Sequence, residues 1–188
     1  ADSFFAQILS AKNIELKKMV ALLKGGAPTP YRYPFTRGTG NYLVALLDAF
    51  SLTGEQDKLK RVESVIRNTL HPQDNIAFRN LDDIENTWSY VVFLQAITSY
   101  LYLKETIEQL DEAYYYARAS LLHYLEWMLE NERPYLSRAE TLEFPNDTWV
   151  AQEIRKLSLF IYGAKYSRDK RELFRSRGKE FLDYIVKS

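Results

Sequence analysis

The chain of 188 residues contains no cysteine, two histidines and no excess charge of either sign. Without cysteine it has no disulfide framework, no thiolate metal site and no cysteine nucleophile. His71 and His123 are too few for a metal site built from several histidines, although one could serve as a general base. No phosphate loop, dinucleotide fingerprint or nucleophile elbow is present. We therefore predict neither a metal nor a cofactor.

The charges exclude two kinds of partner. Twenty-five Lys and Arg balance 25 Asp and Glu, so no field over the whole protein favours nucleic acid or an anionic membrane. The longest uncharged stretch, 87–103, is too short and too polar to span a bilayer. The first residues lack a basic segment followed by an apolar one, and we therefore expect a cytoplasmic protein. With 46% hydrophobic residues, 1–188 is predicted to be a single domain.

A short phrase occurs twice, as Glu-Asn-Thr-Trp at 85–88 and as Asn-Asp-Thr-Trp at 146–149. Each copy closes a polar loop that carries acids and opens a strongly apolar stretch with helical periodicity. A hydroxyl residue at a predicted turn, Thr106 or Ser167, follows each copy at the same spacing. The repetition predicts successive helical hairpins.

The apolar periodicity predicts an all-α protein of about seven helices. A lead helix lies within 1–26, and antiparallel hairpins cover 41–71, 84–131 and 147–188. In the second hairpin the leading helix is apolar on every side, whereas the trailing helix has a single apolar stripe. We expect the same contrast in each hairpin, with enclosed inner helices and amphipathic outer helices. Such hairpins would form a curved two-layer array.

This organisation, with aromatic and acidic residues where inner helices begin, resembles the six-hairpin or α/α-toroid superfamily of carbohydrate-active proteins. The resemblance rests on the hairpin alternation and on the loops that end at Trp88 and Trp149. A complete ring has more helices than this chain, so the resemblance implies a partial toroid or a fragment of one. No catalytic signature of a family in that superfamily matches.

The resemblance places a functional site on the face formed by the loops that enter inner helices, 27–40, 71–86 and 133–147. These are the three long connections of the chain, and long loops commonly carry function. Candidate ligands of a saccharide in these loops and in the first turns of the helices that follow are Arg37, Arg79, Arg138, Trp88, Tyr90, Phe144, Asp147 and Trp149.

Glycoside hydrolysis requires two carboxyl groups that face each other across a sugar. The candidates are Asp83, Glu85, Glu143 and Glu153. Hydrolysis fits these residues better than lyase or epimerase chemistry, which needs a His or Tyr base beside an arginine. Hydrolysis further requires that acids from different loops converge on one concave pocket.

Structural interpretations remain open for the same residues. Trp88 and Trp149 could anchor inner helices in the core, and Asn146 or Asp147 could cap a helix N-terminus. The arginines could tie loops together, and Glu153 could form a buried ion pair with Lys156 or Arg155. The alternative function is a non-catalytic helical-repeat module for protein or subunit interaction. An exposed apolar flank on such a module would predict that the protein forms a homodimer, or that the chain is part of a longer one whose remainder is missing.

Overall fold

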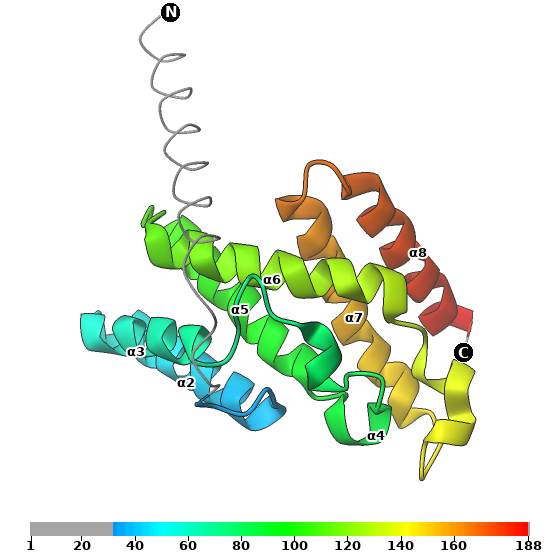
Figure 1. Cartoon of the computed structure of the whole chain (residues 1–188). Coiled ribbons are helices and arrows are strands. Elements are labelled where there is room, and N and C mark those ends of the chain that lie inside the picture. The colour runs from blue at the N-terminus through cyan, green and yellow to red at the C-terminus, as the bar shows by residue number, and fades with distance from the viewer. Residues whose placement is uncertain (1–31, 188) are drawn as a thin grey trace, which may run out of the picture.

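The computed structural model describes residues 32–187, and the predicted lead helix at 1–26 lies outside them. Within this range the regular structure is entirely helical, which confirms the all-α class (Figure 1). The helices in chain order are α2 (Arg37–Thr53), α3 (Gln56–Arg67), the 3-10 helix η1 (Ile76–Arg79), α4 (Ile84–Thr87), α5 (Tyr90–Thr106), α6 (Glu112–Asn131), the 3-10 helix η2 (Tyr135–Thr141), α7 (Thr148–Tyr166) and α8 (Arg171–Lys187).

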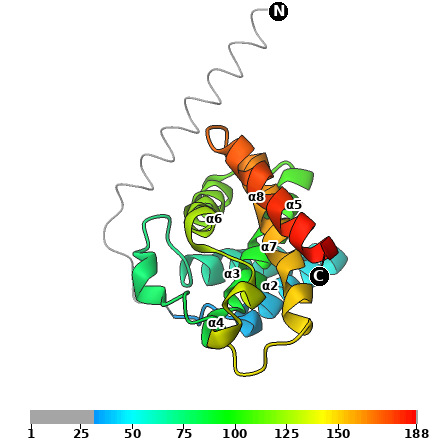
Figure 2. The ribbon, with the colours of Figure 1, turned by 90° about the vertical axis from the view of Figure 1, so that its right-hand side faces the viewer.

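Three hairpins, α2/α3, α5/α6 and α7/α8, lie side by side (Figures 1 and 2). Helix α5 packs against both α2 and α7, so these three leading helices form one layer. Helix α6 contacts both α3 and α8 and forms the second layer with them. Hairpins in two layers are therefore present, and membership of a toroid stays a prediction.

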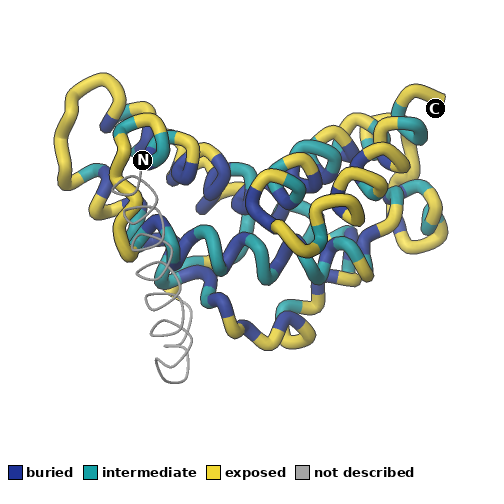
Figure 3. The backbone as a smooth tube through the Cα atoms, turned by 90° about the horizontal axis from the view of Figure 1, so that it is seen from above, coloured by how far each residue is buried: buried dark blue, intermediate teal, exposed yellow. Residues whose placement is uncertain are grey.

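The central helix α5 is enclosed, as its uniformly apolar sequence predicts. Buried side chains cover all of its sides, from Tyr90 at its start to Lys104 near its end. Figure 3 shows buried residues along the inside of the array and exposed residues on its outer turns. The prediction that every leading helix is enclosed is wrong for α2, where Tyr42, Val44 and Leu52 are exposed, and for α7, where Ile154 and Ile161 are exposed. Helix α7 belongs to the last hairpin, and within residues 32–187 no further hairpin covers its outer flank.

Helix α2 begins at Arg37, earlier than the predicted residue 41, and includes Gly38 and Gly40. At Gly40 a Cβ atom would lie 2.9 Å from the backbone nitrogen and Cα of Phe93 in α5. Glycine here permits close contact between two helices rather than a turn. Because glycine is typical of loops, the sequence predicted the start of this helix at residue 41, after Gly40 rather than before it.

A buried lysine ties the first two hairpins together at the end of α5. The Lys104 ammonium lies 3.1 Å from Glu63 of α3 and 2.6 Å from Asp111. Asp111 also caps α6, because its carboxylate accepts a 3.1 Å hydrogen bond from the Tyr114 N–H. The Tyr100 hydroxyl donates to Glu63 at 3.1 Å. Lys104 thus fixes the spacing between the two layers at this end.

Candidate functional site

The two copies of the repeated phrase meet in space. The rings of Trp88 and Trp149 pack edge to face, with centroids 6.0 Å apart and planes inclined by 83°. The loops that precede them also touch, because the Glu143 N–H donates to the Glu85 carboxylate at 3.2 Å. Residues more than 50 positions apart are thereby joined on the face of the long loops, as the hairpin repeat predicts.

A pocket of about 270 Å³, which we call the Trp pocket, opens where these segments meet. The Trp149 indole N–H donates to the Phe144 carbonyl at 3.1 Å and so fixes the position of its ring. The Phe144 side chain is 67% exposed at the rim. The residues that line the pocket are Glu85, Trp88, Phe144, Asn146, Thr148, Trp149 and Gln152.

Local turns hold the second copy of the phrase in place. The Asn146 side-chain oxygen accepts a 2.9 Å hydrogen bond from the Thr148 N–H, so Asn146 stabilises the start of α7. Asp147 occupies the N-cap position without a side-chain capping bond and is exposed. The predicted capping role therefore falls to Asn146, while Asp147 lies outside the pocket lining.

Arg37, at the start of α2, connects the first long loop to this site. Its guanidinium carbon lies 5.9 Å from the centroid of the Trp88 ring, within the range of a cation–π interaction. The Arg37 N–H also donates to the Ser89 hydroxyl at 3.3 Å. Arg37 therefore lies beside one wall of the Trp pocket, with its side chain exposed.

The acids of the two loops do not form a facing pair in the Trp pocket. Among the described residues that line it, Glu85 is the single carboxylate. Asp83 accepts two hydrogen bonds, 3.0 and 3.1 Å long, from the Asn86 side-chain amide within the turn of α4. Glu143 is exposed outside the lining. The geometry thus offers one carboxylate beside aromatic and amide side chains.

The structure places Glu153 in the core and not at the site. Its side chain is fully buried, accepts the Tyr135 N–H and lies 3.3 Å from the Lys156 ammonium. Burial raises the pKa of Glu153 to about 7, while the charge of Lys156 opposes that rise. The buried contact with Lys156 that the sequence left open as an alternative to catalysis is therefore present.

A second carboxylate shares Lys156. The Glu132 side chain is buried 2.7 Å from the Lys156 ammonium and accepts a 2.6 Å hydrogen bond from the Tyr90 hydroxyl. Tyr90, predicted to bind substrate, is thus a core residue, and its pKa is raised by burial and by Glu132. Helices α5, α6 and α7 meet at this cluster of two acids and one base.

Arg79 and Arg138 also differ from their predicted role. The Arg79 guanidinium pairs with Asp74 at 2.9 Å, donates to the Thr69 carbonyl at 2.6 Å and packs over the Phe35 ring. It therefore ties the loop after α3 to the core. Arg138 lies in η2, outside the lining of the Trp pocket.

Asp74 is a centre of contacts that the sequence did not reveal. Its buried carboxylate accepts hydrogen bonds from the Tyr124 hydroxyl at 2.6 Å and from the His71 N–H at 3.1 Å. The Nε2 atom of His123 lies 2.7 Å from the Asp74 carbonyl oxygen. Tyr124 and His123 come from α6, so neither spacing nor composition could have identified them as partners. Burial lowers the pKa of His71.

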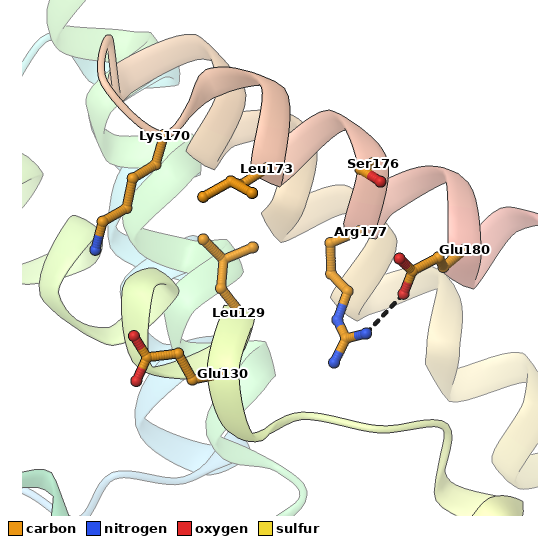
Figure 4. Close-up of a pocket in the computed structure, with 7 residues that line it drawn as sticks. All are labelled: Leu129, Glu130, Lys170, Leu173, Ser176, Arg177 and Glu180. Atoms are coloured by element: carbon orange, nitrogen blue, oxygen red, sulfur yellow. Dashed lines mark hydrogen bonds and ion pairs between the residues drawn. The ribbon is translucent and has the colours of Figure 1, made fainter.

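Two further hollows flank α6. A polar hollow of about 630 Å³ lies beside Asp74 and His123, where the carboxylate of Asp74 is already satisfied by its partners. A smaller one of about 270 Å³ lies between the end of α6 and α8, where Arg177 pairs with Glu180 at 2.6 Å (Figure 4). Because charges of both signs line each hollow, neither defines a ligand class.

Residues 32–187 contain no cluster of three or more His, Asp or Glu side chains with the geometry of a metal site. In the same part of the chain, every helix is too short or too polar to cross a membrane. Comparison of the chain with protein-family models, with characterised proteins and with solved structures finds no significant match.

Proposed function

We propose that the protein binds a saccharide in the Trp pocket and does not hydrolyse it. The observation that carries the proposal is the convergence of Trp88 and Trp149, one from each copy of the repeat, on one pocket that also contains Asn146 and Gln152. Aromatic rings pack against the apolar C–H faces of sugars, and amides both donate to and accept from hydroxyl groups.

The charge of the pocket favours a neutral or cationic sugar over a uronate. Glu85 is the charged residue of the lining, and an ionised carboxylate accepts hydrogen bonds from sugar hydroxyls. Arg37 lies nearby, beside Trp88, with its guanidinium exposed. A volume of about 270 Å³ is close to the lower end of small-molecule pockets, so we expect one or two sugar rings to be bound.

The carboxylates of the lining support binding without hydrolysis. Cleavage of a glycosidic bond needs an acid and a second carboxylate across the sugar, and the lining supplies Glu85 alone. Glu153 is enclosed in the core. The position of the pocket on the face of the long loops is the one that the resemblance to six-hairpin proteins implies.

Titration with neutral, amino and acidic mono- and disaccharides, followed by tryptophan fluorescence and by thermal shift, tests the proposal. We expect Phe144→Ala and Gln152→Ala to weaken binding by about tenfold or more, equivalent to about 1.4 kcal/mol. The matched control is Phe78→Ala, because Phe78 is 88% exposed and lies in η1, outside the pocket.

Trp149→Ala should abolish binding, but this ring also packs 5.1 Å from Tyr135, so its loss affects folding as well. Phe144 and Gln152 therefore decide the outcome. Failure of every saccharide to bind, or equal losses for Phe144→Ala and Phe78→Ala, would overturn the proposal. Release of reducing sugar by the wild type, lost in Glu85→Gln, would replace binding with hydrolysis.

A further inference from the structure

A groove of about 690 Å³ runs between α7 and α8, on the flank that no other described helix covers. It is separate from the Trp pocket and shares no lining residue with it. Its apolar lining comes from both helices and consists of Leu157, Ile161, Ala164, Phe174, Gly178 and Leu182.

The remaining lining residues are all cationic: Lys165, Arg171, Arg175 and Lys179. Arg171, Arg175 and Lys179 are spaced by four residues, so they form a stripe along one face of α8. We call it the cationic stripe. It runs parallel to the apolar row of Phe174, Gly178 and Leu182, which has the same spacing. A ligand in this groove therefore meets apolar surface and positive charge together.

Part of the apolar lining is open to solvent, whereas Phe174 and Gly178 are buried at its base. Ile161 is 61% exposed and Leu182 is 46% exposed. At Gly178 a Cβ atom would make only ordinary contacts, 3.6 Å from Leu157 and Phe160, so the fold does not require glycine there. Glycine inside a helix costs about 0.5–1 kcal/mol relative to alanine. Gly178 lines the groove without a side chain, so a larger side chain there would take up groove volume next to Leu157.

We propose that this groove binds an acidic amphipathic helix of another protein. The apolar lining residues extend over 157–164 of α7 and 174–182 of α8, which is about 10–12 Å at the rise of an α-helix. About two turns of a partner helix fit this length, with apolar anchors at positions i, i+3 or i+4, and i+7. Asp or Glu residues beside those anchors would face the cationic stripe.

The cations are available to such a partner. Arg175 pairs with Glu172 at 2.9 Å and Lys179 with Asp183 at 2.6 Å, but each pair lies within α8 and is exposed to water. Lys165 pairs with Glu105 at 2.6 Å. Exposed ion pairs contribute little free energy, so exchanging one carboxylate for a partner's costs little.

Charge argues against two other occupants. A second copy docked symmetrically through this groove would bring the cationic stripe against itself, and like charges repel. The segment 1–31 of the same chain carries four lysines and only two acidic residues, so it has the wrong sign. An acidic helix complements both the shape and the charge of the groove.

The test uses a fluorescent synthetic peptide with Leu at i, i+3 and i+7 and Glu at the flanking positions, and a second peptide with Lys in place of Glu. Fluorescence anisotropy with the full chain should show binding of the Glu peptide, at least tenfold weaker binding of the Lys peptide, and weakening by salt. Gly178→Leu, which takes up groove volume, should abolish binding. Circular dichroism verifies that this variant is folded.

Charge reversal provides the second arm. The double variant Arg171→Glu, Arg175→Glu should lose the Glu peptide and gain the Lys peptide. The matched control is Lys58→Glu, Lys60→Glu, which makes the same change in net charge on exposed positions of α3. The control should keep the preference for the Glu peptide.

Several outcomes would overturn the proposal. These are no binding of the Glu peptide, equal binding of both peptides, or equal effects of the α8 and α3 charge reversals. Binding to phosphatidylserine vesicles but not to the Glu peptide would identify a membrane surface instead. Self-association that Gly178→Leu abolishes, seen by sedimentation without peptide, would identify a second copy as the occupant. Results with saccharides have no bearing on this test, because the Trp pocket is separate.

Discussion

Substitution of Glu153 by Gln should change how the stability of the protein depends on pH. Glu153 and Glu132 share the ammonium of Lys156, so the buried cluster holds two carboxyl groups and one cation. All three side chains are almost completely enclosed. A proton on Glu153 reduces the excess negative charge without breaking the shorter pair between Lys156 and Glu132. The cluster is therefore best stabilised when Glu153 is protonated.

The pKa of Glu153 gives the size and the sign of the effect. Burial raises it from an ordinary 4.5 to about 7. Each unit of this change corresponds to about 1.4 kcal/mol, so ionising Glu153 in the folded protein costs on the order of 3 kcal/mol. Below pH 4.5 the group is protonated in both the folded and the unfolded chain. As the pH rises towards 7 the unfolded chain loses the proton first, so stability falls over this window.

Urea unfolding of the wild type and of Glu153→Gln between pH 5 and pH 8 measures the effect. The amide oxygen of Gln can still accept the Tyr135 N–H, and the side chain no longer ionises. Relative to the wild type, the variant should gain about 2 kcal/mol between pH 5 and pH 8. His71, whose pKa is lowered by burial, contributes the opposite slope to both proteins, so it cancels in the difference.

Glu140→Gln serves as the control, because Glu140 is exposed in η2. Its unfolding free energy should follow that of the wild type at every pH. Identical pH profiles for the wild type and Glu153→Gln would refute the raised pKa of Glu153. So would a variant that loses stability relative to the wild type as the pH rises.

The remaining predictions concern packing and charge within the hairpin array, and urea unfolding at pH 7 measures each. Gly40→Ala should destabilise the protein by about 1–3 kcal/mol, because its Cβ would overlap the Phe93 backbone, whereas Gly38→Ala in the same helix should stabilise it by up to about 1 kcal/mol. Equal effects would contradict the close crossing of α2 and α5. Lys104→Met should cost about 2 kcal/mol, less than breaking a fully buried pair, because Glu63 keeps some contact with water. No loss would mean that the ion pair does not hold the first two hairpins together.

The sequence was sufficient to predict the six long helices within residues 32–187 and their order, but not the short helices η1, α4 and η2, which lie in segments expected to be loops. Uninterrupted apolar residues marked α5 as a central helix, and Trp88 and Trp149 marked where leading helices begin. Two features of the fold could not be predicted from the sequence, for physical reasons. Gly40 serves a contact between helices that only the folded chain contains. The exposed flank of α7 depends on the absence of a neighbour within residues 32–187, and the helix's own pattern does not report its neighbours.

The candidate site was predicted in part. The repeated phrase indicated that the segments around Trp88 and Trp149 belong to equivalent positions of two hairpins, and these segments do meet. Phe144 and Glu85, which the sequence also offered as candidates, line the same pocket. Gln152, which lines the pocket one turn into α7, was missed, although its spacing from Trp149 and Thr148 places it on the same helix face.

An acid on an apolar helix can be a catalytic group or one half of a buried pair, and Glu153 shows why one sequence cannot separate these. Its neighbour Lys156, on the same face of α7, was visible in the sequence. Its other partners, Glu132 and the Tyr135 N–H, come from the end of α6 and from η2. Those contacts decide whether the carboxylate meets solvent or backbone. The fold that encloses Glu153 also leaves Phe144 exposed and brings it together with the partly buried Trp149 in the Trp pocket, so the loop before α7 packs against the core on one side and forms a pocket on the other.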